Sequence, residues 1–328
     1  MEFRTQILPK ELKHKINYQK PCISIGSCFA TNMGEKLLAS KFNILINPFG
    51  IIYNPVSIAN AVIRSTQCQY YNEQELIYFN HKFISLDHHG EYSSADKNDC
   101  LDKINSAILK THTTLKNASH LFITLGTAWV YKHIEQNKVA ANCHKIPQKE
   151  FEKTILSSEE IISELQKAIY ECRKINNSIN IIFTLSPVRH LNDGFIENQL
   201  SKSVLHFAIQ QIISRAENCN YFPAYEIMMD DLRDYRFYKE DMLHPNETAI
   251  QYIWEKFCQV SVEKKSVAML PKIEEIRKAL QHRPFFQSSE EYKKFALTSL
   301  QKIELVKKAF PEICFEHETA FFEEKLKG

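Results

Sequence analysis

The chain has 328 residues, of which 44% are hydrophobic, so it is long enough to form one large domain with a substantial core. Lys and Arg number 41 against 39 Asp and Glu, and the formal net charge of +2 gives no electrostatic reason to expect a nucleic acid or an anionic membrane as a partner. The N-terminal residues do not resemble a signal peptide, and no run of about 18 apolar residues occurs, so we expect a soluble, cytoplasmic protein. Its nine cysteines form an odd set without close pairs, and disulfides are not expected.

Four apolar segments are rich in β-favouring side chains and end in Gly, Asn-Pro or Ser-Pro, as is typical of buried strands in a parallel sheet. They span residues 22–25, 42–46, 121–125 and 179–185. Helical spacing of apolar residues predicts helices over 28–39, 197–217 and 246–260. The second of these is expected to form one apolar face from Leu200, Val204, Leu205, Ala208, Ile209 and Ile212. Because the alternation requires crossover connections, we predict an α/β fold with three α/β/α layers and a mostly parallel sheet.

The character of the sequence changes near residue 262, where strand-like segments stop and charged amphipathic helices are predicted. We therefore divide the chain into a main domain, residues 1–261, and a helical C-terminal extension, residues 262–328. The extension is either a solvated pair of helices packed on the main domain or a lid or partner-binding element.

Polar and glycine-containing segments follow each of the four predicted strands. They are Gly26-Ser27-Cys28, Asn47-Pro48-Phe49-Gly50, Gly126-Thr127-Ala128-Trp129 and Ser186-Pro187-Val188-Arg189-His190. Because ligands bind at the carboxyl ends of the strands in open parallel sheets, we expect these segments to converge on one site.

Cys28 is placed at the start of the predicted helix 28–39, where backbone N–H groups and the helix dipole favour a thiolate. This is a position for a nucleophile, although a cysteine there could also fill space behind a tight turn. The neighbouring Ser27 is the competing nucleophile and could equally cap the helix.

Asp241 and His244 lie three residues apart on a loop that enters the predicted helix 246–260. At this spacing the carboxylate can orient the imidazole and stabilise its protonated form, which a general base requires. The alternative is a surface or capping histidine.

Other polar residues have weaker assignments. Cys143, His144, His88 and His89 could supply ligands to zinc, but their spacing matches no tight metal signature, and neither a metal nor another cofactor is expected. The expected substrate-binding residues are Arg189, His190, Lys202, Asn142 and His144. Arg189 or Lys202 could bind an acidic group through charge-assisted hydrogen bonds, or could form salt bridges with Asp193 or Glu197 instead.

Several of these segments together resemble the GSCFA family, a group similar to the SGNH (GDSL-like) hydrolases. The resemblance covers about residues 18–258. It is carried by Gly26-Ser27-Cys28-Phe29-Ala30, Asn47-Pro48-Phe49-Gly50, Tyr53-Asn54-Pro55, Leu125-Gly126-Thr127-Ala128-Trp129, Asn142-Cys143-His144-Lys145, Ser186-Pro187-Val188-Arg189-His190 and Asp241-Met242-Leu243-His244-Pro245.

This resemblance implies a flavodoxin-like domain that cleaves or transfers acyl esters. In SGNH enzymes a serine in a Gly-Asp-Ser turn is the nucleophile, and an Asp-x-x-His pair follows late in the chain. Aligned on Gly26, that serine position is occupied by Cys28, and Asp241 and His244 match the pair. The resemblance also implies an oxyanion hole that includes Gly50, with Gly126 or Thr127 in place of the usual asparagine. The expected activity is thus that of an esterase or acyltransferase on a small-molecule or acylated substrate. The alternatives are a ligand-binding protein without catalysis and a metal-binding protein.

Overall fold

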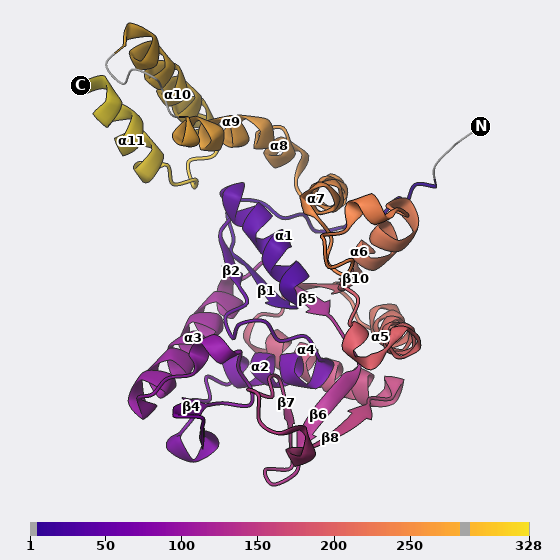
Figure 1. The fold of residues 1–328 in the computed structure, drawn as a ribbon. Coiled ribbons are helices and arrows are strands. Elements are labelled where there is room, and N and C mark those ends of the chain that lie inside the picture. The colour runs from indigo at the N-terminus through magenta and orange to yellow at the C-terminus, as the bar shows by residue number, and fades with distance from the viewer. Residues whose placement is uncertain (1–4, 283–288, 328) are drawn as a thin grey trace.

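A parallel five-stranded sheet forms the centre of the computed structural model, which describes residues 5–282 and 289–327 (Figure 1). Its strands are β1 (Cys22–Gly26), β2 (Ile44–Ile46), β5 (His120–Leu125), β9 (Asn180–Leu185) and β10 (Cys219–Tyr221). They lie in the order β10-β9-β5-β1-β2, which is the flavodoxin-like arrangement. The four strands that the sequence predicts are confirmed as β1, β2, β5 and β9, and β10 is an addition.

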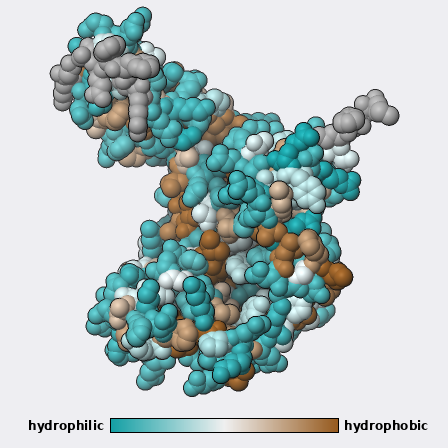
Figure 2. Space-filling model, in the orientation of Figure 1, coloured by the Kyte–Doolittle hydropathy of each residue, from teal (hydrophilic) through white to brown (hydrophobic). Residues whose placement is uncertain are grey.

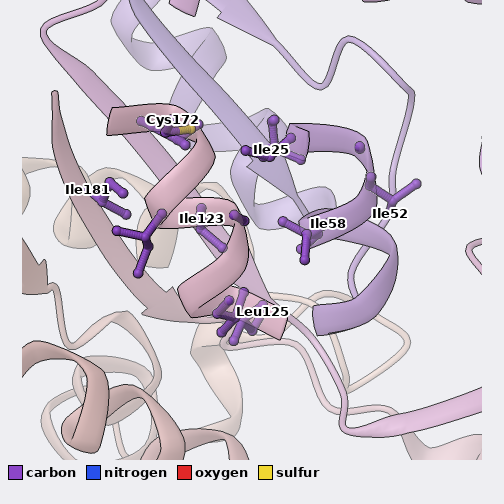
Figure 3. Close-up of a cluster of buried hydrophobic side chains, with 14 of the residues drawn as sticks. Ile25, Ile52, Ile58, Ile123, Leu125, Cys172 and Ile181 are labelled. Carbon is purple, nitrogen blue, oxygen red and sulfur yellow. The ribbon is translucent and has the colours of Figure 1, made fainter. Parts of the chain in front are cut away.

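Helices cover both faces of this sheet. On one face, α2 (Pro55–Thr66), α3 (Lys97–Asn117), α4 (Ser158–Ile175) and α5 (Phe195–Arg215) enclose a continuous apolar core. Figure 3 shows part of that core, where Ile25, Ile123 and Ile181 of the strands meet the helices. On the other face lie α1 (Cys28–Ala39) and α7 (Glu247–Ser261). The predicted three-layer α/β/α architecture and the helix over 28–39 are confirmed.

The prediction for α5 is correct in part. Leu205, Ala208, Ile209 and Ile212 are buried against the sheet, but Leu200 is 49% exposed. It lies on a side of the helix where Phe195, Ile196 and Phe207 are also exposed, and Figure 2 shows hydrophobic surface in this region. The expected single apolar face was wrong at Leu200, because the buried side of the helix continues instead through Ser201 and Lys202.

Two small antiparallel elements, which the sequence analysis did not predict, are inserted between the parallel strands. One is the hairpin of β3 (Ile77–Phe79) and β4 (Lys82–Ile84). The other is a three-stranded sheet in the order β7-β6-β8, formed by β6 (Trp129–His133), β7 (Lys138–Ala140) and β8 (Phe151–Ile155). The second sheet begins directly after the carboxyl end of β5.

A short helix, α6 (Ala224–Glu226), precedes α7. The C-terminal part contains α8 (Lys264–Val267), α9 (Leu270–Gln281), α10 (Glu290–Ala309) and α11 (Glu316–Lys327). These four C-terminal helices extend away from the sheet in Figure 1. They are joined to the main domain by apolar contacts, including the rings of Tyr18 and Phe310 with centroids 4.9 Å apart, and by the Lys41–Glu318 salt bridge. Among the described residues, no helix combines the length and the apolar character needed to cross a membrane.

Candidate active site

Gly26 ends β1 at a point where no side chain fits. Its φ is +153°, and a Cβ atom would collide with the carbonyl oxygen of Thr124 on the paired strand β5. The amide of Gly26 donates to Oδ1 of Asn47 at 2.8 Å, which connects this turn to the end of β2. The glycine is therefore required by the close approach of two strands directly before Cys28.

Ser27 is buried, with 2% of its surface exposed. Its hydroxyl donates to Oγ of Ser186 at 3.0 Å and accepts from the amide of Phe29 at 3.2 Å, so it is the N-cap of α1. These two bonds join the ends of β1 and β9 and occupy the hydroxyl.

Cys28 is half-buried at the first position of α1. Burial raises the pKa of its thiol, and this effect outweighs the lowering by the amides of Phe29 and Cys28 and by the Lys239 and Lys202 ammonium groups. The amides at the helix N-terminus thus favour the thiolate as expected, but burial has the larger effect. The thiol needs a base to remove its proton.

Asp241 and His244 form the hydrogen-bonded pair that their spacing predicts. Oδ2 of Asp241 lies 2.6 Å from Nδ1 of His244, while Oδ1 accepts from the amides of Leu243 and His244 at 2.9 and 3.0 Å. The two amide bonds, with His244 the larger effect, lower the pKa of Asp241 to about 2. Because the carboxylate holds Nδ1, Nε2 is the ring atom available to accept a proton.

The loop that carries this pair lies over the same edge of the sheet as Cys28. The amide of Arg189, in the segment after β9, donates to the carbonyl of Leu243 at 3.5 Å, and the amide of Lys239 donates to that of His244 at 2.8 Å. The Lys239 ammonium on this loop opposes the burial that raises the pKa of the Cys28 thiol. Residues more than two hundred positions apart are thereby brought to one edge.

Lys202 does not have the surface position that a substrate clamp requires. It is 1% exposed, and its ammonium donates to the carbonyls of Gly126 at 2.7 Å and Ser186 at 2.8 Å. Arg189 directs Nη2 to Sδ of Met229 at 3.0 Å. The expected contact of Lys202 with an acidic substrate group is therefore corrected, because the side chain spans the interior between two strand ends.

His190 is enclosed beside Gly126. Its ring stacks on Tyr53 with centroids 5.0 Å apart, and its amide donates to Oδ1 of Asn198 at 3.0 Å. Burial lowers the pKa of His190 to about 4, so the ring is neutral at pH 7, and its buried Nε2 has no hydrogen-bond partner within residues 5–282 and 289–327.

The three expected oxyanion donors already have intramolecular partners. The amide of Gly50 donates to the carbonyl of Asn47 at 2.8 Å, and that of Gly126 to the carbonyl of Tyr53 at 2.8 Å. The hydroxyl of Thr127 lies 3.0 Å from that of Ser201. Stabilisation of an oxyanion by Gly50 or Gly126 would require that the amide leave or share its backbone hydrogen bond, so their role as oxyanion donors stays a prediction.

The three histidines considered for zinc bind other protein groups. Nε2 of His144 bonds to the carbonyl of Ser85 at 2.8 Å, and Nδ1 of His88 to Oγ of the same serine at 2.9 Å, while Nδ1 of His89 lies 3.4 Å from Glu91. Oδ1 of Asn142 accepts from the amide of His144 at 2.8 Å and shapes the turn. Within residues 5–282 and 289–327, no group of three or more His, Cys, Asp or Glu side chains is placed to hold a metal ion.

Sequence reasoning did not assign roles to Tyr53, Ser186 or Lys239, which all act at this edge. Tyr53 and Ser186 belong to segments after predicted strands, and that position was the available signal. Lys239 had no local pattern that distinguishes it from other surface lysines.

Two solved structures are similar to this chain in outline. The Clostridium thermocellum family 3 carbohydrate esterase shares 10% sequence identity, with a TM-score of 0.36 over 77% of this chain and 97% of the other. A carbohydrate esterase family 3 protein from Talaromyces cellulolyticus shares 9% identity, with a TM-score of 0.36 over 78% of this chain and 99% of the other.

No curated protein matches the sequence. Residues 21–257 match the GSCFA family, and residues 273–328 match the C-terminal domain of GSCFA domain proteins. With most of its length covered by this match, the chain belongs to the GSCFA family.

Proposed function

We propose that this protein cleaves or transfers acyl esters through a covalent thioester on Cys28, with His244 as general base and Asp241 as the residue that orients it. The observation that carries the proposal is the Asp241–His244 hydrogen bond of 2.6 Å, on a loop bonded to the strand edge where Cys28 begins α1. This arrangement supplies a general base with Nε2 of His244 free to accept a proton, and a thiol that must lose its proton before it can attack.

In the proposed reaction, Nε2 of His244 takes the thiol proton as Sγ of Cys28 attacks the ester carbonyl. The tetrahedral intermediate collapses to a thioester, and the leaving alkoxide receives the proton from His244. Water or another acceptor then attacks the thioester, His244 accepts its proton, and the thiol is restored with release of the acyl product. The backbone N–H of Cys28 is the remaining donor that the proposal assigns to the oxyanion.

Cys28 is preferred over Ser27 because of what each side chain already does. The serine hydroxyl is buried and bonded to Ser186 and Phe29, whereas the thiol is half-buried. A nucleophile must reach the substrate, so the more accessible neighbour is the better candidate.

A screen of short acyl esters and thioesters tests the proposal. We expect turnover by the wild type, loss of turnover in Cys28→Ala and His244→Gln, and an acyl adduct on the peptide that contains Cys28. Ser27→Ala, checked for folding because it removes an N-cap, should keep measurable activity. Activity that survives Cys28→Ala but disappears in Ser27→Ala would identify the serine as the nucleophile.

A second candidate function is ligand binding without catalysis. It is favoured by the raised pKa of Cys28 and by the occupied amides of Gly50 and Gly126. The same screen separates the two: a folded protein that binds ligand but forms no acyl adduct on Cys28 supports the binding function.

A further inference from the structure

A cavity of about 380 Å³ lies at the carboxyl edge of the main sheet. One wall is formed by residues that follow the main-sheet strands, among them Tyr53 after β2, Thr127 after β5 and His190 after β9. The opposite wall is formed by the inserted sheet, with Trp129 and Tyr131 of β6. Its volume is within the range of about 300–1,000 Å³ that is common for small-molecule sites, so it is large enough for a ligand.

The cavity is close to the proposed nucleophile. Tyr53 lines it, and burial raises the pKa of this tyrosine, with further effects from Cys143 and Cys28. The carbonyl of Tyr53 accepts the amide hydrogen bond of Gly126, and its ring stacks on His190. Tyr53 therefore connects the cavity with the edge of the sheet that carries Cys28.

The lining is nearly free of net charge. Among its described residues there is no Lys or Arg, and the single carboxylate, Asp193, is paired with Lys153. Burial raises the pKa of Cys143 to about 11 and lowers that of His190 to about 4, so both groups are neutral at pH 7. A charged ligand would lose hydration here, and the one carboxylate of the lining already has Lys153 as its partner, which disfavours the binding of a further charge.

The neutral groups combine ring surface with hydrogen-bonding capacity. Tyr53, Trp129 and Tyr131 supply aromatic rings, and the indole N–H of Trp129 is already bonded to the carbonyl of Glu197 at 3.2 Å. Asn142 keeps its NH₂ group as a donor after its oxygen accepts from His144. Nε2 of His190 is buried beside the cavity and has no hydrogen-bond partner among the described residues.

We propose that this cavity binds a neutral, polyhydroxylated ring of about the size of one monosaccharide unit. Hydroxyl groups accept hydrogen bonds from the Asn142 carboxamide, and the C–H faces of the ring pack on the aromatic side chains. If the cavity is the substrate subsite of the Cys28 reaction, the inference rests on the proposed function. Binding of the ring by itself requires only the cavity.

The sequence provides a built-in reporter for a direct binding experiment. It contains two tryptophans, and the other one, Trp254, lies on the buried side of α7 and is 6% exposed. We would titrate the wild type and Trp254→Phe with the methyl glycosides of glucose, galactose and mannose and follow tryptophan fluorescence. At least one glycoside should give a saturable change that is absent in Trp129→Phe, so the experiment remains informative if Trp254→Phe does not fold.

Matched probes and variants test the chemistry of the site. Glucuronate and glucosamine, which carry a charge on a similar ring, and cyclohexanol, which has one hydroxyl, should bind at least tenfold more weakly than the best glycoside. Tyr131→Ala should weaken that glycoside about tenfold, the effect of losing about 1.4 kcal/mol. The control Tyr78→Ala removes a 61% exposed ring on β3, outside the cavity, and should bind as the wild type does.

The outcomes separate this inference from the proposed reaction. Saturable binding by Cys28→Ala without turnover supports the site independently of catalysis. Tighter binding of a charged probe or of cyclohexanol, equal responses in Trp129→Phe and wild type, or no response to any of the three glycosides in a folded protein would overturn the inference, even if Cys28 proves to be acylated.

Discussion

Lys202 and Ser186 are joined by a hydrogen bond of 2.8 Å from the buried ammonium to the backbone carbonyl. The same ammonium donates to Gly126, so one side chain of α5 links the segments that follow β5 and β9. The hydroxyl of Ser186 in turn receives the hydrogen bond from Ser27, next to Cys28. Through these contacts, Lys202 supports the turn that presents the proposed nucleophile.

This arrangement makes the stability of the fold depend on pH. Burial lowers the pKa of Lys202 to about 7 in the folded state, against an ordinary value of about 10.4 in the unfolded chain. At a pH between these two pKa values, the unfolded state binds more protons than the folded state. The free energy of unfolding therefore rises with pH by up to about 1.4 kcal/mol per pH unit. Lys202→Met should lose this rise.

Urea denaturation at pH 7, 8 and 9 measures this effect. The difference in unfolding free energy, wild type minus Lys202→Met, should increase with pH. Lys116→Met, at an exposed position on α3, is the matched control and should keep a curve parallel to that of the wild type. Parallel curves for Lys202→Met as well would show that the ammonium does not titrate in this range.

Gly26→Ala should strongly destabilise the protein. The added Cβ would meet the backbone of Thr124, and the residue would have to keep a positive φ that alanine disfavours. We expect a loss of about 3 kcal/mol in the free energy of unfolding. Gly90→Ala is the control, because a Cβ at Gly90 has nothing within 4 Å, and its effect should stay within about 0.5 kcal/mol. Equal effects of the two substitutions would contradict the structural reason given for Gly26.

The strands of the main sheet could be predicted because burial on both faces leaves a plain signal in the sequence. All residues of β1, β5 and β9 are buried, and the continuous apolar segments reflect this. The inserted sheet could not be found in this way. Its β8 strand, Phe-Glu-Lys-Thr-Ile, has one buried residue, and its alternation is too weak to distinguish it from a loop.

The candidate site also has features that the sequence predicts and features that it does not. The Asp241–His244 bond could be predicted, because a spacing of three residues within one turn limits the geometry. The interior position of Lys202 could not, because a lysine on a helix usually reaches solvent. Backbone hydrogen bonds such as that from Gly50 to Asn47 could not be predicted either, because the partner of a backbone amide depends on the turn that the chain adopts.

Lys239→Met should slow the alkylation of Cys28. The exposed ammonium of Lys239 lowers the pKa of the thiol, so its removal decreases the thiolate fraction at a given pH. We expect a decrease of about two- to fivefold in the iodoacetamide rate at pH 8, measured on the Cys28 peptide by mass spectrometry, since a shift of one pKa unit gives a tenfold change. The difference should shrink in 1 M salt, where the screening length is about 3 Å.

Lys36→Met, on the last turn of α1, is the control for Lys239→Met. An unchanged rate in Lys239→Met would place the loop of Asp241 and His244 farther from Cys28 than the structure does.

Asp241→Asn should abolish most of the proposed activity. The carboxylate holds Nδ1 and leaves Nε2 free, whereas the NH₂ group of asparagine can reverse the tautomer. The NMR shifts of the His244 ring nitrogens report the tautomer without a substrate, and kcat on any ester that the wild type cleaves should fall by on the order of 10³–10⁴. Because the pKa of Asp241 is about 2, the wild-type pair should stay intact down to about pH 3. Asp234→Asn, at a neighbouring exposed carboxylate, should change neither quantity. If Asp241→Asn leaves both the tautomer of His244 and kcat unchanged, the carboxylate does not orient the ring in solution, and His244 loses its role as an oriented base.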